Sequence, residues 1–153
     1  MRVFFACVLV VAAVMAAGAS GTSAQPPVGQ PKGTRHDAAF ESCAKACNDC
    51  EQVCTSCATH CADLLAQGQK DHQKTLATCR DCATTCAAAA RIVAAKGPFA
   101  DLICTACADA CKRCGDACDQ FKDDPMMKQC ADECRRCEKV CRDMPARTGA
   151  KGK

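Results

Sequence analysis

The chain of 153 residues is long enough for one domain, and its formal net charge of +3 at pH 7 is small. So weak a charge, together with the lack of Trp and Tyr for stacking on bases, argues against nucleic-acid binding. The composition is unusual in having 19 cysteines but only five phenylalanines. A core of ordinary apolar side chains would therefore be thin, and another kind of interaction must help to hold the fold together.

The first 24 residues predict a cleaved signal peptide. Arg2 precedes an apolar run over residues 3–17, which is too short to span a bilayer, and small residues follow up to Ala24. A single arginine favours the general secretory route, so we expect an exported, periplasmic protein without a membrane segment in its mature form. Export by this route would bring reduced thiols into an oxidising compartment.

Residues 25–36 contain three prolines and two glycines and predict a flexible linker. The last nine residues, 145–153, predict a disordered basic tail. The region between them, residues 37–144, is rich in Ala, Cys and charged residues, and it is the expected folded domain.

Helix-ending residues divide this domain into four predicted helices. Gly68 and Gly97 follow the first two, and Pro125 opens the last one behind Asp124 as its N-cap. Short connections make successive helices antiparallel, so we expect an all-α, up-down-up-down four-helix bundle. The predicted helices are residues 37–67, 71–96, 98–122 and 124–144.

Every cysteine except Cys7 lies in one of these helices, where the gaps between cysteines alternate between three and four residues. This is the a/d pattern of a heptad, which keeps all of these side chains on one narrow stripe of a helix. We therefore expect a bundle with a cysteine-lined core. The 18 residues are Cys43, Cys47, Cys50, Cys54, Cys57, Cys61, Cys79, Cys82, Cys86, Cys104, Cys107, Cys111, Cys114, Cys118, Cys130, Cys134, Cys137 and Cys141.

Three roles for these thiols other than metal binding fit the pattern less well. Cβ atoms at i,i+4 on a helix lie about 5–6 Å apart, whereas a disulfide needs about 3.8 Å. A redox Cys-x-x-Cys motif works at a helix N-terminus, but these cysteines lie within helices. Cysteine as a small apolar residue explains single positions, but not a complete stripe from which Leu, Ile and Val are nearly absent.

Metal binding suits the spacing. Thiolates favour soft ions, above all Cu(I). Zinc sites close with four ligands, and nothing in the continuous stripe divides it into sets of four. Cu(I) accepts two or three thiolates, so a stripe of any length can be filled, and metal–thiolate bonds would cross-link the helices in place of an apolar core.

Four short helices with inward Cys-x-x-x-Cys and Cys-x-x-Cys repeats resemble the copper storage proteins, a family of cysteine-rich four-helix bundles. The similarity covers about residues 37–144 and depends on many cysteines rather than one motif. It implies a non-enzymatic protein that stores multiple Cu(I) ions, roughly one per core thiolate, and that assembles as a homotetramer. A general sink for Zn(II), Cd(II) or Ag(I) and a disulfide-stabilised structural bundle remain the alternatives.

The resemblance also implies metal uptake through His and Met residues at one open end. In an antiparallel bundle, His72, Met127, His60 and Met126 fall at the end near residues 60–72. His36 and Met144 fall at the opposite end. The heptad count places His72 and Met127 on the cysteine stripe and His60 beside it. The candidates are His72, Met127, His60, Met126, His36 and Met144.

Overall fold

The computed structural model describes the backbone of residues 35–148 and the side chains of residues 37–144. The predicted signal peptide over residues 1–24 and the predicted linker over residues 25–36 lie almost wholly outside the described residues, as does the end of the predicted tail. The chain divides into two units, and the described helices all belong to the unit Lys32–Lys153.

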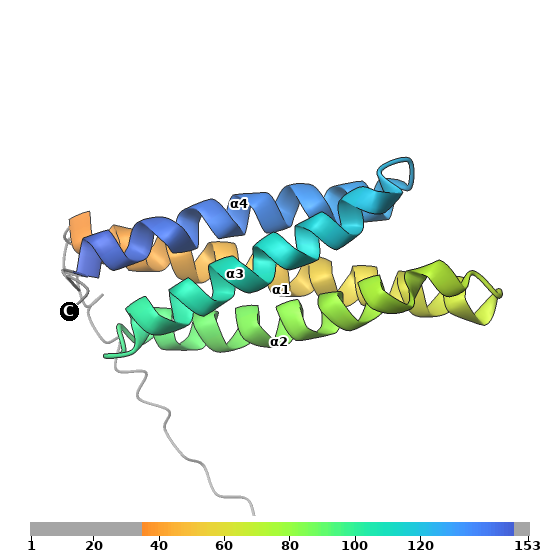
Figure 1. Ribbon diagram of the computed structural model, residues 1–153. Coiled ribbons are helices and arrows are strands. Elements are labelled where there is room, and N and C mark those ends of the chain that lie inside the picture. Colours follow the sequence, from red (N-terminus) through yellow and green to blue (C-terminus); the bar gives the residue numbers. More distant parts are fainter. Residues whose placement is uncertain (1–34, 149–153) are drawn as a thin grey trace, which may run out of the picture. The chain divides into compact units, whose positions relative to one another are not determined.

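Four α-helices make up this unit, and its described part contains no strand (Figure 1). The predicted all-α four-helix bundle is therefore confirmed. Short 3₁₀ turns precede α2 and follow α3. The elements are α1 (Arg35–Ala66), η1 (Lys70–His72), α2 (Gln73–Ala94), α3 (Ala100–Cys118), η2 (Asp119–Phe121) and α4 (Pro125–Thr148).

Sulfur contacts between helices fix their relative directions. Further along α1, its contacts on α4 have lower residue numbers: Cys43 contacts Cys141, and Cys54 contacts Cys130. On α3 the residue numbers increase instead: Cys43 contacts Cys104, and Cys54 contacts Cys114. Helix α1 is therefore antiparallel to α4 and runs in the same direction as α3, as up-down-up-down order requires.

The ends of two helices form as the sequence predicts. Gly68 has a φ of 90°, and the amides of Gly68 and Gln69 close α1 by bonding to the carbonyls of Leu65 and Leu64. At the start of α4, the Asp124 carboxylate accepts hydrogen bonds from the amides of Met126 and Met127, at 2.8 and 3.2 Å. Both connections lie at the same end of the bundle.

The second helix was predicted to run to about Lys96, directly before Gly97, whereas α2 ends at Ala94. Lys96 has the positive φ, of 51°, and Gly97 follows it. A Cβ on Gly97 would lie only 3.2 Å from Cγ2 of Ile92 and 3.3 Å from its carbonyl oxygen. Glycine is therefore placed where the chain passes close to the helix, and the lysine bears the left-handed turn.

Helix α4 also continues further than predicted. It passes Pro145 and ends at Thr148, whereas the sequence suggested a stop before Pro145 and a tail from that residue on. Proline removes one backbone hydrogen bond, and a helix held along the rest of its length can lose one bond in its last turns without ending.

Charged residues cover the outside of the bundle, as expected for its solvated face. Arg136 of α4 pairs with Asp49 of α1 at 2.9 Å, and Arg142 of α4 pairs with Asp109 of α3 at 3.1 Å. Exposed ion pairs of this kind contribute less than about 1 kcal/mol each. No helix of the described region is both long and apolar enough to cross a membrane.

Candidate metal centre

All 18 predicted core cysteines are buried, with at most 1% of each side chain exposed, and all are free thiols in the described structure. The heptad pattern explains this, because gaps of three and four residues return each cysteine to the same side of its helix. Few other side chains reach the core. Those that do are mainly alanines, with Phe40, Val93, Met127 and Met144 toward the ends.

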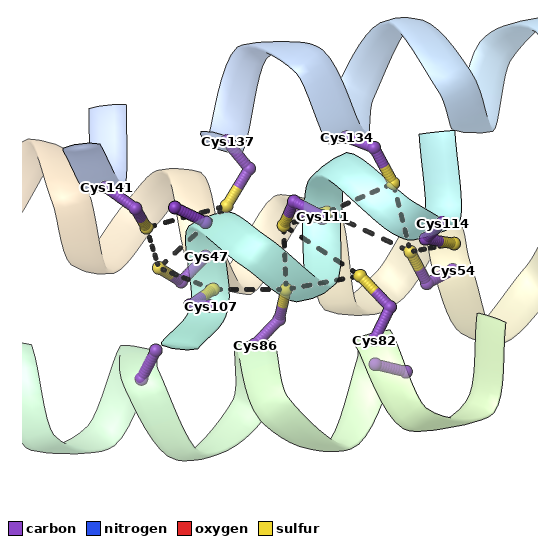
Figure 2. Packing of buried hydrophobic residues seen from close by; sticks show 14 of the residues in the cluster. Cys47, Cys54, Cys82, Cys86, Cys107, Cys111, Cys114, Cys134, Cys137 and Cys141 are labelled. Atoms are coloured by element: carbon purple, nitrogen blue, oxygen red, sulfur yellow. Dashed lines mark hydrogen bonds between the residues drawn. The ribbon is translucent and has the colours of Figure 1, made fainter. Parts of the chain in front are cut away.

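The sulfur atoms form a connected column along the bundle (Figure 2). Cys47 and Cys141 lie 3.4 Å apart, and Cys86 bridges Cys107 and Cys111 at 3.6 Å each. These contacts join thiols from different helices. The column is therefore shared by the whole bundle rather than divided between helices.

These spacings suit a soft ion held by several thiolates. With a metal–sulfur bond of about 2.3 Å, tetrahedral or trigonal coordination places two sulfurs about 3.8–4.0 Å apart, and linear coordination about 4.6 Å apart. The contacts between core sulfurs run from 3.4 Å for Cys47–Cys141 to 4.0 Å for pairs such as Cys137–Cys141. Small rotations of the side chains would complete such sites. A disulfide, by contrast, requires about 2.05 Å.

Groups of four sulfurs within 4.8 Å of one another recur along the column, although nothing in the spacing along the chain indicated sets of four. The groups overlap, because Cys50, Cys54 and Cys130 each belong to two of them. Separate tetrahedral sites cannot all be filled at once when ligands are shared. Three of the groups are Cys47–Cys107–Cys137–Cys141, Cys50–Cys82–Cys86–Cys111 and Cys57–Cys79–Cys118–Cys130.

Burial affects the protonation of these thiols. At Cys61, near the end of the column, burial is the largest cause and the nearby thiol of Cys57 adds to it, and together they raise the pKa to about 12. The metal-free thiol is therefore protonated at neutral pH. Metal binding at such a site must release a proton.

Met127 and His72, the two uptake candidates predicted to lie on the cysteine stripe, are both buried. The Met127 sulfur lies 3.5 Å from the Cys57 sulfur, so the thioether extends the thiol column. His72 stacks on Phe121 with ring centroids 4.1 Å apart. Within the described region its Nδ1 is a buried atom without a hydrogen-bond partner, and such an atom is available to a metal.

His60 and Met126 lie at the same end but outside the column. The Nε2 atom of His60 is 2.7 Å from Oδ2 of Asp124, and both side chains are partly exposed. Burial alone would raise the pKa of Asp124, but the hydrogen bonds from His60 and from the Met127 and Met126 amides hold it below its usual value. Asp124 is thus a polar residue at this end that the sequence identified only as a cap.

The opposite end of the bundle has a different character. Met144 is buried there, with 1% of its side chain exposed, and it lines a small groove with Ala39 and Val140. His36 lies in the first turn of α1, and its side chain is outside the described residues. The described structure therefore gathers four of the six uptake candidates at the end near Asp124.

A helical bundle whose core is a continuous column of free thiols belongs to the class of soft-metal-binding proteins. The sequence profile of the copper storage protein family matches residues 36–146. The chain therefore belongs to the copper storage protein family, as the resemblance noted from its sequence implied.

Solved structures and a curated relative agree with this assignment. The Cu(I)-bound copper storage protein BsCsp3 is 35% identical, with a TM-score of 0.64 over 69% of this chain and 97% of that one. A cytosolic copper storage protein from Streptomyces lividans, solved with five coppers, is 31% identical, with a TM-score of 0.65 over 72% of this chain and 95% of that one. The uncharacterized cysteine-rich protein YhjQ of Bacillus subtilis (strain 168) is 36% identical over 88 residues, which are 55% of this chain and 76% of that protein.

These comparisons correct the prediction of an exported, periplasmic protein. The Streptomyces lividans relative is a cytosolic storage protein. A short apolar run behind a single arginine was a weak basis for export.

Proposed function

We propose that this protein stores Cu(I) on the thiolates of its core. The observation that carries the proposal is the column of 18 buried free thiols with contacts of 3.4–4.0 Å across helices. Thiolate is a soft ligand and Cu(I) a soft ion. Because neighbouring groups share sulfurs, an ion that accepts two or three thiolates can occupy the column continuously, at roughly one ion per cysteine.

A titration tests this proposal directly. The reduced protein is mixed with increasing Cu(I) in the presence of a chromophoric Cu(I) chelator, without oxygen. We expect the protein to withhold more than about ten ions per chain from the chelator. Binding of only a handful of ions, or native material that contains disulfides instead of free thiols, would contradict storage.

The four-sulfur groups favour one alternative, a general sink for Zn(II), Cd(II) or Ag(I). Zinc prefers four tetrahedral ligands, and the group Cys47–Cys107–Cys137–Cys141 could provide them. Because the groups overlap, zinc should fill fewer sites than Cu(I). Metal analysis after loading with Zn(II) or Cu(I), each in competition with a chelator, separates the two roles, since a general sink would also retain Zn(II) in its four-sulfur groups.

For copper uptake we infer a route through the end of the bundle near Asp124. His72 supports it, because a buried nitrogen without a hydrogen-bond partner at this end of the bundle is a free ligand. Met127 supports it through its sulfur contact with Cys57. His60 and Met126 would guide copper from outside the column, and the buried Met144 is a candidate ligand at the other end.

We also propose that residues 37–144 form the complete copper-binding domain and that it assembles as a homotetramer. The second proposal rests on the family resemblance. Light scattering coupled to gel filtration measures the mass in solution, and a monomer at micromolar concentration would contradict it. A storage role requires no catalytic residue, so we propose a protein that is not an enzyme.

A further inference from the structure

Cys82 alone among the 18 core cysteines keeps any exposed surface, at 1%. A groove of about 410 Å³ lies on the side of the bundle between α2 and α3. Its lining includes Cys82, a cysteine of the column, together with Ala106 and Ala110 of α3. The two alanines leave the space open, because their side chains are too short to cover α2. Three other grooves of the described region contain no cysteine.

Cys82 holds a central position in the thiol column. It belongs to two groups of four sulfurs, one with Cys86 and Cys111 and the other with Cys54 and Cys134. Figure 2 shows its sulfur directed toward Cys111 of α3, at 3.8 Å, while Cys86 lies at 3.9 Å along its own helix. A ligand that reaches Cys82 would therefore reach the middle of the column without passing either end.

The rim of the groove carries charges of both signs. Arg113 of α3 is exposed, and its guanidinium makes no ion pair with any side chain of residues 37–144. Asp81 of α2 supplies a carboxylate at the same opening, and Asp109 of α3 supplies a second one, which also pairs with Arg142 at 3.1 Å. An occupant with one carboxylate and one ammonium group complements this rim, and a volume of this size suits a small molecule.

We propose that this groove is a lateral exchange port, where a small zwitterionic thiol replaces Cys82 as a copper ligand. The inference rests on the proposed storage function. In the exchange, a bond from Cu(I) to the incoming sulfur forms and the bond to Cys82 breaks. The proton of the incoming thiol moves to the Cys82 sulfur, and no atom is oxidised or reduced. Copper stored in mid-column could then leave without emptying an end first.

The first test needs no metal. Reduced apo-protein is treated briefly with iodoacetamide, and peptide mass spectrometry measures the modified fraction of each cysteine. Since alkylation follows access to the thiol, Cys82 should react several-fold faster than Cys86, which lies one turn away on the same helix. Ala110→Leu, which fills the groove, should remove this difference. Equal rates at Cys82 and Cys86 in the unchanged protein would overturn the proposal.

The second test follows copper. Protein loaded with Cu(I) transfers it to a chromophoric chelator, with or without millimolar free cysteine as the small thiol. Cysteine should accelerate transfer, and Ala110→Leu should reduce that acceleration at least about fivefold, because exchange depends on access to the sulfur. Ala87→Leu is the matched control, since Ala87 lines the α1–α2 groove that contains no cysteine.

The two proposals fail in different ways. If neither variant changes the acceleration by free cysteine, the lateral port is wrong and storage is unaffected. If the unchanged protein withholds no copper from the chelator, storage itself is wrong. If Ala87→Leu slows transfer as much as Ala110→Leu does, the effect is a general one on the bundle and the port is again overturned.

Discussion

At the scale of single residues, Asp124 connects the fold to the proposed uptake end. One carboxylate oxygen caps α4 through the amides of Met126 and Met127, and the other meets His60 of α1 at 2.7 Å. An N-cap contributes about 0.5–2 kcal/mol. A side chain that also joins two helices should contribute at the upper end of this range.

Asp124→Ala should therefore destabilise the apo-protein by about 2 kcal/mol, measured by chemical denaturation. Asp124→Asn is the matched control, because Asn also caps well but carries no charge. The folded-state pKa of Asp124 is lowered, so its stabilisation is present above the unfolded value and is lost as the pH falls through the folded one. The Asn variant should lose less stability on acidification, and equal acid sensitivity would contradict this role.

His72 allows a second prediction at this scale. Its buried Nδ1 lacks a hydrogen-bond partner in the described region, and an unsatisfied polar atom costs about 1–3 kcal/mol. His72→Leu should therefore leave the apo-protein equally or more stable in denaturant. It should nevertheless slow the uptake of Cu(I), measured by stopped-flow absorbance, if Nδ1 is a ligand on the route.

His60→Gln is the comparison for His72, because His60 is partly exposed and lies outside the column. We expect its effect on uptake to be smaller. Uptake at the unchanged rate in His72→Leu would remove that residue from the proposed route, whatever its effect on stability.

At the scale of helices, Gly115 of α3 makes room for a side chain of α4. A Cβ at this position would lie 3.0 Å from Nη1 of Arg135 and 3.1 Å from its Cζ. The guanidinium is held there by Asp116 at 2.6 Å and Asp119 at 2.7 Å. The guanidinium of Arg135 is therefore the group that the missing side chain of Gly115 accommodates.

A double-mutant cycle tests this contact. Alanine in a helix is more stable than glycine by about 0.5–1 kcal/mol, but here the new methyl group would displace Arg135. Gly115→Ala should therefore stabilise the protein by that amount only in an Arg135→Ala background, and by less in the unchanged protein. Equal gains in both backgrounds, measured by denaturation, would show that the contact has no energetic weight.

A helix end could be predicted from the sequence where neighbouring residues alone determine it. Gly68 and Asp124 were predictable, because a left-handed turn and an N-cap are local requirements. The turn after α2 was not, because it depends on how close Gly97 comes to Ile92. The pairing of His60 with Asp124 spans 64 positions, and only the relative rotation of α1 and α4 brings the two together.

At the scale of the whole molecule, the thiol stripe was fully predictable, because the heptad spacing alone determines which side chains face inward. The sharing of sulfurs between groups of four, and the opening beside Cys82, were not. Both depend on the distances between helices, which are set by small residues such as Ala106 and Ala110. The sequence therefore predicted which residues line the core, but not how far apart the sulfurs of different helices lie.

The protonation of the core leads to the last prediction, that apo and copper-loaded protein respond to pH in opposite directions. Burial raises the pKa of Cys61 to about 12, whereas an unfolded thiol titrates near about 8.5. The stabilisation from keeping such a thiol protonated is complete below the unfolded value and is lost as the pH rises toward the folded one. Apo-protein should therefore unfold at progressively lower denaturant concentration above about pH 8.5.

Copper-loaded protein holds its sulfurs as thiolates, so protons compete with the metal and its stability should fall with decreasing pH instead. Denaturation midpoints of both forms are measured without oxygen from neutral to alkaline pH. Lysine titration affects the two forms alike, so the difference between their midpoints isolates the thiols. That difference should widen as the pH rises, and it should widen less in Cys61→Ala. A constant difference would mean that copper does not bind by displacing protons from these buried thiols.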